Sequence, residues 1–227
     1  MAGNNFVASI DIGTEKIALL AADIEDSGHL RIIAHNFCSS DGVKKGSLSS
    51  IDSLARVIRK LIEKTKKDFG YKVELARINI SDTHLTCTDG KGKVSIDEAV
   101  TLKDLDSVLE SAMAMSTPTN KEKLHIIKKK FIINENVVVD NPMEMEAEVL
   151  ESKVHIVTVS SSSIRNIERC LEQSELEAEK IVLNSIAKSH ALLSQEDKDS
   201  GVCLVDIGAG VTSYSVFNEE GIVRSGV

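Results

Sequence analysis

The amino-acid sequence predicts an α/β protein in which a strand-rich module interrupts a main domain. Three observations support this fold class. Strand-like alternation opens the chain at residues 6–38, an amphipathic helix follows from Ile51, and the tripeptide Asp-Ile-Gly occurs at Asp11 and again at Asp206. Hydrophobic residues make up 42% and charged residues 27% of the 227 residues, which is typical of folded domains and excludes a disordered or collagen-like chain.

Charge and cysteine content narrow the class of protein. The formal net charge of −8 argues against a nucleic-acid partner, because phosphate binding is driven by clustered lysines and arginines. The four cysteines lie far apart with no C-x-x-C pair, so we expect reduced thiols and neither a zinc site nor a redox motif. No apolar run approaches the roughly 20 residues that cross a bilayer, and we expect a cytoplasmic protein.

The first 83 residues predict three strands, a helix and a fourth strand. Alternation places the first three strands at Phe6–Ile12, Lys16–Ile24 and Leu30–Cys38, with glycines in the turns. From Ile51 the apolar residues recur at helical spacing, with a serine at 49 or 50 as the N-cap and a glycine at 70 beyond the end. Ala76–Ser81 predicts the fourth strand.

Residues 84–160 predict a compact module of strands and one helix. We expect short strands at Leu85–Thr88 and Gly92–Ile96, a helix at Leu102–Met115 opened by a capping box of Thr101 and Asp104, and long strands near 124–134 and 153–160. The lysines at 128–130 are expected on the exposed side or edge of a strand.

The remaining chain returns to alternating helices and strands. A helix from 161, a strand at Lys180–Leu183 and a helix at Ser185–Leu193 are expected. The polar residues 194–201 are expected to form a linker, followed by strands at Val202–Asp206 and Ser213–Phe217. Single histidines on these elements, His155 among them, are expected to be structural.

The two Asp-Ile-Gly segments are the most informative pattern for function. Each follows an apolar strand and leads through a turn into a second strand, so the turn can present backbone N–H groups to an anion such as phosphate. Thr14 or Thr212 can add a hydroxyl donor. Asp11 and Asp206 would repel a polyphosphate unless a cation lies between, which predicts hydrated Mg²⁺ and a nucleoside triphosphate. One such tripeptide alone would indicate only a hairpin, but its recurrence favours the site.

These motifs resemble the paired phosphate hairpins of the actin-like ATPase superfamily, and within it the chain resembles the FtsA family of bacterial cell-division proteins. Further segments carry the resemblance: residues 40–46, 80–85, 141–142 and 154–158. The resemblance implies an actin-like (ribonuclease H-like) subdomain 1A at 1–83 and 161–199, an inserted subdomain 1C at 84–160, and the beginning of subdomain 2A at 200–227. It therefore leads us to expect the N-terminal portion of a longer protein, which by itself binds ATP poorly.

The resemblance also implies the ligands and their residues. ATP with Mg²⁺ is expected, with Asp11 and Asp206 holding the metal through water. The residues implied to bind phosphate are Gly13, Thr14, Lys16, Gly208, Ala209, Gly210 and Thr212. Ala209 and Val211 depart from the family pattern. Ala209 would bring a Cβ atom near the phosphates and Val211 lacks a hydroxyl, so the second turn fits phosphate less well than the family pattern does. The helix at 184–190 offers no carboxylate and only Asn184 as an amide, which predicts at most a slow ATPase with nucleotide as a structural or regulatory ligand.

Partners are likewise implied by the resemblance. They are FtsZ, through a region outside this chain, later division proteins such as FtsN, through residues 84–160, and other copies of the protein in filaments. Membrane attachment, at the cytoplasmic face of the division septum, would use a C-terminal helix outside this chain. The alternatives are a PilM-like ATP-binding protein of pilus assembly, and an active actin-fold ATPase or kinase.

Overall fold

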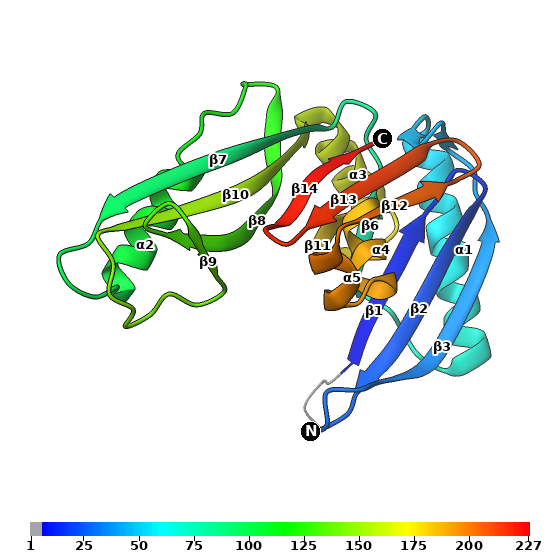
Figure 1. Cartoon of the computed structure of the whole chain (residues 1–227). Coiled ribbons are helices and arrows are strands. Elements are labelled where there is room, and N and C mark those ends of the chain that lie inside the picture. The colour runs from blue at the N-terminus through cyan, green and yellow to red at the C-terminus, as the bar shows by residue number, and fades with distance from the viewer. Residues whose placement is uncertain (1–5) are drawn as a thin grey trace. The chain divides into compact units, whose positions relative to one another are not determined.

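The computed structural model describes residues 6–227, and residues 1–5, where the predicted subdomain 1A begins, lie outside the described part (Figure 1). The chain divides into two compact units. Unit 1 comprises the chain up to Thr83 together with Ser161–Ala187 and Ile207–Thr212. Unit 2 comprises His84–Ser160, Lys188–Asp206 and Ser213–Val227.

Unit 1 is built on a five-stranded sheet in the order β11-β6-β1-β2-β3. The bounds of its strands are β1 Phe6–Ile12, β2 Lys16–Ile24, β3 Leu30–Ser39, β6 Leu75–Ile80 and β11 Glu177–Leu183. The strands β1, β2 and β3 are antiparallel neighbours, whereas β6 runs parallel to β1 and to β11. The predicted first three strands are therefore confirmed, and the parallel pair brings the carboxyl ends of β1 and β6 to the same edge.

Two helices and a small hairpin complete unit 1. Helix α1, Ile51–Phe69, packs against β2 and β3 and against α3, Ser161–Gln173, and lies behind the blue strands in Figure 1. Ser50 caps α1 as predicted, and Gly70 closes it with a φ of 78°. The short strands β4 (Val43–Lys44) and β5 (Ser47–Leu48) form the hairpin between β3 and α1.

Unit 2 contains an antiparallel sheet in the order β7-β10-β8-β9 with one helix, α2, on its face. The bounds are β7 Thr86–Ser95, α2 Leu102–Met113, β8 Lys121–Ile133, β9 Val137–Val139 and β10 Val149–Ser160. The predicted capping box of Thr101 and Asp104 opens α2. Buried apolar residues of α2 meet those of β10 in the core between helix and sheet, among them Val108, Leu150 and Ile156.

The expectation of two short strands at 85–88 and 92–96 is wrong, because β7 runs without interruption from Thr86 to Ser95. Its glycines suggested a break, but they have a packing function. A Cβ atom at Gly90 would lie 2.0 Å from the carbonyl oxygen of Ala112, and one at Gly92 would lie 2.0 Å from that of Val108. The backbone of α2 thus rests directly on β7, and only glycine leaves room for it.

Two further expectations are corrected in unit 2. Residues 194–201 are not a structureless linker, because α5 (Gln195–Ser200) forms there, with Ser194 and Asp197 in a capping box. The lysines at 128–130 do not all face solvent, because the side chain of Lys129 is 5% exposed and its Nζ lies 2.8 Å from Oδ2 of Asp89. A buried lysine requires such a partner.

The last strands form a three-stranded sheet, β12-β13-β14. Their bounds are β12 Val202–Ile207, β13 Thr212–Asn218 and β14 Gly221–Gly226, and helix α4, Asn184–Leu192, precedes them together with α5. The turn between β12 and β13 belongs to unit 1, whereas β14 packs within unit 2 against β7, β8 and β10. Among the helices of residues 6–227, none is long and apolar enough to cross a membrane.

Candidate functional site

The first Asp-Ile-Gly segment closes the β1–β2 hairpin of unit 1. Asp11 and Ile12 end β1, and the N–H of Gly13 donates to the carbonyl oxygen of Lys16 at 3.0 Å. A Cβ atom at Gly13 would lie 2.8 Å from that same oxygen, so the tight turn depends on glycine. Lys16 is exposed at the start of β2. The turn therefore has the compact geometry expected of an anion-binding loop.

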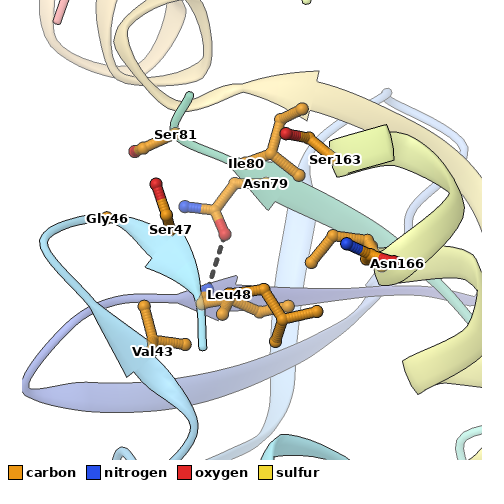
Figure 2. A pocket seen from close by; sticks show the side chains of 11 residues that line it. Val43, Gly46, Ser47, Leu48, Asn79, Ile80, Ser81, Ser163 and Asn166 are labelled. Carbon is orange, nitrogen blue, oxygen red and sulfur yellow. Dashed lines mark hydrogen bonds between the residues drawn. The ribbon is translucent and has the colours of Figure 1, made fainter. Parts of the chain in front are cut away.

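The side chain of Asn79, on β6, fixes the end of β1. Its Nδ2 donates to Oδ1 of Asp11 and, at 3.2 Å, to Oδ1 of Asn184, the first residue of α4. Its own Oδ1 accepts from the N–H of Ile12 at 2.5 Å, the bond drawn dashed in Figure 2. Both amide hydrogens and the amide oxygen are thus engaged, which orients Asn79 in one way only. Asp11 is held at the sheet edge by this amide.

The turn that follows the second Asp-Ile-Gly segment contacts the first hairpin within unit 1. A Cβ atom at Gly210 would lie 2.4 Å from Oγ1 of Thr14, so the two turns touch backbone to side chain. The same Oγ1 accepts from the N–H of Gly46 at 3.0 Å, and Gly46 also faces the side chain of Val211. Thr14 therefore lies where the β1–β2 turn, the β4–β5 turn and the β12–β13 turn meet, and its hydroxyl hydrogen remains available to donate.

The second turn itself is short and open to solvent. The N–H of Gly208 donates to the carbonyl oxygen of Val211 at 3.0 Å, the counterpart of the bond that closes the first turn. Gly208, Ala209 and Thr212 are exposed. The two turns therefore share a hydrogen-bonding pattern as well as a sequence pattern.

Asp206 lies in unit 2, where a lysine neutralises it. Nζ of Lys188, on α4, is 2.6 Å from Oδ2 of Asp206, and the hydroxyl of Ser213 is 3.5 Å from the same oxygen. The two charged side chains are 34% and 26% exposed, respectively. An ammonium group on this oxygen does not fit a carboxylate that faces Mg²⁺. Asp11, which is oriented by an amide and has no lysine bonded to it in the described residues, has the donor chemistry that hydrated Mg²⁺ accepts.

Residues 6–227 contain no group of three or more histidine, cysteine or acidic side chains that could hold a metal by themselves. Mg²⁺ bound with a nucleotide needs only one or two carboxylates, because phosphate oxygens and waters supply the other ligands. If the metal binds here, Asp11 would hold it through water.

A small cavity of about 80 Å³ lies beside Asn79 in unit 1. Figure 2 shows the polar side chains of Ser47, Ser81, Ser163 and Asn166 around it, from the β4–β5 hairpin, the end of β6 and helix α3. This volume holds a few water molecules and is far below the roughly 300 Å³ of small ligand pockets. The cavity is therefore too small to be a ligand site, and we interpret it as a packing defect beside Asn79.

Unit 2 contains a buried polar network that resembles a hydrolase triad in its bonding order. Nδ1 of His155 lies 3.0 Å from Oδ1 of Asp89, and Nε2 lies 3.2 Å from Oγ of Ser225 on β14. The thiol of Cys87 lies 3.0 Å from that same hydroxyl. His155 is 1% and Ser225 5% exposed, so no substrate reaches them. The expected structural role of His155 is confirmed, since both ring nitrogens are bonded.

Ionisation follows from this burial. Burial lowers the pKa of His155, although the hydrogen bond to Asp89 opposes it. Burial would raise the pKa of Asp89, but its hydrogen bonds to Lys129 and His155 together bring that pKa below its usual value. Burial raises the pKa of the Cys87 thiol. The network therefore holds a neutral imidazole, a neutral thiol and one ion pair.

Sequence reasoning missed three residues at the predicted phosphate hairpins: Asn79, Gly46 and Lys188. A signal for Asn79 exists, because it is the polar residue between Ile78 and Ile80 at the carboxyl end of a parallel strand beside β1. Lys188 follows Asn184 by four residues and therefore lies on the same side of α4. Nothing in the sequence marks Gly46 as the partner of Thr14.

Comparison with known proteins gives a consistent family. Residues 82–158 match the model of the SHS2 domain inserted in FtsA. Cell division protein FtsA of Pseudomonas aeruginosa is 32% identical over 222 residues, covering 97% of this chain and 53% of that protein. FtsA of Borreliella burgdorferi is 31% identical over 226 residues, covering 98% and 55%. The chain thus spans about half the length of the curated relatives it matches.

Solved structures share the fold at low sequence identity. The PilM-PilN type IV pilus biogenesis complex matches with a TM-score of 0.64 and 14% identity, covering 96% of this chain and 60% of that one. Ethanolamine utilization protein EutJ of Carboxydothermus hydrogenoformans matches with a TM-score of 0.50, 14% identity and coverage of 97% and 50%. The fold is that of the actin-like ATPases. With the inserted domain and the relatives found over nearly its whole length, the chain is an FtsA-like protein with an actin-like fold.

Proposed function

We propose that the chain binds ATP at its two glycine turns, as part of a cell-division scaffold in which nucleotide orders self-association. The observation that carries this proposal is the contact of Gly210 with Thr14, which joins the two Asp-Ile-Gly turns in one unit. The N–H groups of Gly13 and Gly208 close the two turns. Those of Thr14, Ala209 and Gly210 would bind phosphate oxygens, and the hydroxyl of Thr14 would add a donor. Lys16 and Thr212 would contribute at the rims of the turns.

The chemistry of the site favours binding over turnover. Hydrolysis requires a group that takes a proton from the attacking water. In the helix at 184–190, Asn184 is the side chain that the sequence offers for this role, and an amide does not accept that proton at neutral pH. Asn184 is moreover bonded to Asn79 at 3.2 Å, which holds it at the sheet edge. We therefore propose a nucleotide that acts as a structural or regulatory ligand.

Titration of a fluorescent ATP analogue tests the binding proposal. Gly210→Val would push the second turn away from Thr14 and should weaken the affinity at least tenfold. Gly28→Ala is the control, because a Cβ atom at Gly28, in the β2–β3 turn, meets nothing within 4 Å, and its φ of +83° strains only that turn. Equal affinity of wild type and Gly210→Val would contradict a site formed by the two turns.

The partners of the whole protein follow as part of the same proposal. An FtsA-like scaffold would link the FtsZ ring to the cytoplasmic face of the membrane at the septum and would recruit later division proteins such as FtsN through residues 84–160. Affinity capture on the full chain tests the recruiting role. Substitutions on the surface of residues 84–160 that leave division proteins bound would refute that assignment.

Two alternatives have specific support. Structural similarity to PilM favours a scaffold of pilus assembly, and capture of pilus proteins without division proteins would favour it over the division role. The actin-like ATPase fold is compatible with an active ATPase or kinase. Release of many phosphates per second from MgATP, abolished by Asp11→Ala, would show that turnover is the function.

A further inference from the structure

The ion pair of Lys188 and Asp206 changes what the second Asp-Ile-Gly segment can do. Asp206 occupies the same position in the second Asp-Ile-Gly segment as Asp11 does in the first, yet the two carboxylates have different partners. Asp11 is bonded by a neutral amide, whereas Asp206 is bonded by an ammonium group at 2.6 Å. The pair lies entirely within unit 2. A neutral donor leaves a carboxylate's charge in place, and a lysine cancels it.

Partial burial makes this pairing persistent. The two side chains are only 34% and 26% exposed, so the attraction between them is screened less than that of a surface pair. The hydroxyl of Ser213 lies beside the same Oδ2. Hydrated Mg²⁺ at Asp206 would lie beside an ammonium group that already neutralises the carboxylate. The metal would therefore have to compete with Lys188 for the single negative charge of Asp206.

We propose that Lys188 is the resident cation of Asp206 and that Asp206 holds no metal. The proposal concerns how the nucleotide proposed above is bound. The positive charge beside Asp206 would come from the lysine, which has further N–H donors besides the one facing Asp206. The dependence of nucleotide binding on Mg²⁺ would then rest on Asp11 alone.

A metal titration without nucleotide tests this assignment by itself. Mn²⁺ serves as the probe, because its free concentration is measured directly by electron paramagnetic resonance. Lys188→Met removes the ammonium group and keeps the aliphatic stem, and it should raise the affinity for Mn²⁺ at least fivefold. Adding Asp206→Asn to this variant should abolish the gain. Lys60→Met, at an exposed position of helix α1, makes the same change of net charge elsewhere and should leave Mn²⁺ affinity unchanged.

Nucleotide titration gives the second measurement. The quantity compared is the nucleotide affinity measured with Mg²⁺ divided by the nucleotide affinity measured with EDTA. Asp206→Asn alone should change this ratio less than twofold from its wild-type value. Lys188→Met alone should raise the ratio at least fivefold over wild type. Circular dichroism of each variant establishes that it is folded, and Lys188→Gln replaces Lys188→Met if the methionine variant is not.

The outcomes separate the two proposals. Equal Mn²⁺ affinity of wild type and the Lys188 variant, including no binding by either, would overturn the role of Lys188. Loss of nucleotide binding by every protein, wild type included, would refute the proposed function, while the Mn²⁺ titration would still decide whether the lysine excludes metal from Asp206.

Discussion

Nδ1 of His155 lies 3.0 Å from Oδ1 of Asp89, inside a sheet face covered by β14. Burial keeps this imidazole neutral, with a pKa below its ordinary value. The groups around it are the carboxylate of Asp89 and thiol of Cys87 on β7, the ammonium of Lys129 on β8, and Ser225 on β14. Protonation would place a second cation beside a carboxylate that Lys129 already neutralises.

Stability should therefore fall in mild acid. The unfolded chain takes up the histidine proton near pH 6.5, whereas the folded chain takes it up only at lower pH, so the free energy of unfolding decreases as pH falls below about 6.5. Urea denaturation from pH 7.5 to 5 measures this decrease. His155→Gln should flatten the profile in this range, and an unchanged slope would contradict the assignment to His155. The lowered pKa of Asp89 adds its own loss only at more acidic pH, below its ordinary value near 3.8.

Lys129→Met should destabilise unit 2 although the substitution preserves most of the side-chain volume. It leaves the carboxylate of Asp89 with His155 as its remaining partner in this network, and we expect a loss of about 2 kcal/mol. Lys128→Met, at the exposed neighbouring position, should cost less than about 0.5 kcal/mol. Thermal unfolding of both variants measures the difference. The double variant with Asp89→Asn should lose less than the sum of the single losses, because both side chains belong to one network.

Gly90→Ala should be among the most disruptive single-methyl additions in the chain. The new Cβ would meet the carbonyl oxygen of Ala112 at 2.0 Å, and a backbone atom of a helix cannot move aside alone. We expect a loss of about 3 kcal/mol or more, measured by thermal unfolding. Gly28→Ala is the control, since it has free space and only the strain of a φ of +83°, about 1 kcal/mol. Equal losses in the two variants would show that α2 does not rest on β7 as described.

Asn79→Leu should weaken nucleotide binding without contact to the nucleotide. The substitution removes the amide that orients Asp11 and bonds Asn184, and we expect about a tenfold loss of affinity, which corresponds to about 1.4 kcal/mol. Asn166→Ala, which lines the same small cavity from α3, serves as the control and should bind normally. Normal binding by Asn79→Leu would remove Asn79 from the candidate site. Fluorescent-nucleotide titration supplies the measurement.

Local pattern predicted the elements of unit 1 well, because their signals are local. The alternation of β1 and β2 and the serine cap of α1 each arise from side chains within a few residues of one another. The predictions fail where contacts between residues distant in the sequence determine the structure. In the sequence Gly90 indicates a turn, but its function is to make room for α2. Lys129 indicates an exposed position, but it is buried in an ion pair with Asp89. Segment 194–201 resembles a linker for another reason, because the capping box of Ser194 and Asp197 stands among other polar residues.

The candidate site was also predictable only in part, because its turns have local signals and its long-range contacts do not. Repetition of Asp-Ile-Gly pointed to two similar turns, and the structure gives both turns the same closing hydrogen bond. The contact between Thr14 and Gly210 spans almost two hundred positions and has no local signal. The partners of the two aspartates differ for the same reason, because Asn79 and Lys188 come from other elements. Phosphate and metal roles for these residues stay predictions that the titrations above test.

The glycines of β7 also have a mechanical consequence. Between most helices and sheets a layer of side chains lets one slide slightly over the other, but α2 and β7 meet backbone to backbone at Gly90 and Gly92. A displacement of the helix should therefore carry the strand with it. Asp89 adjoins Gly90, so a displacement of α2 should also shift the carboxylate that His155 bonds, and through His155 the strand β14.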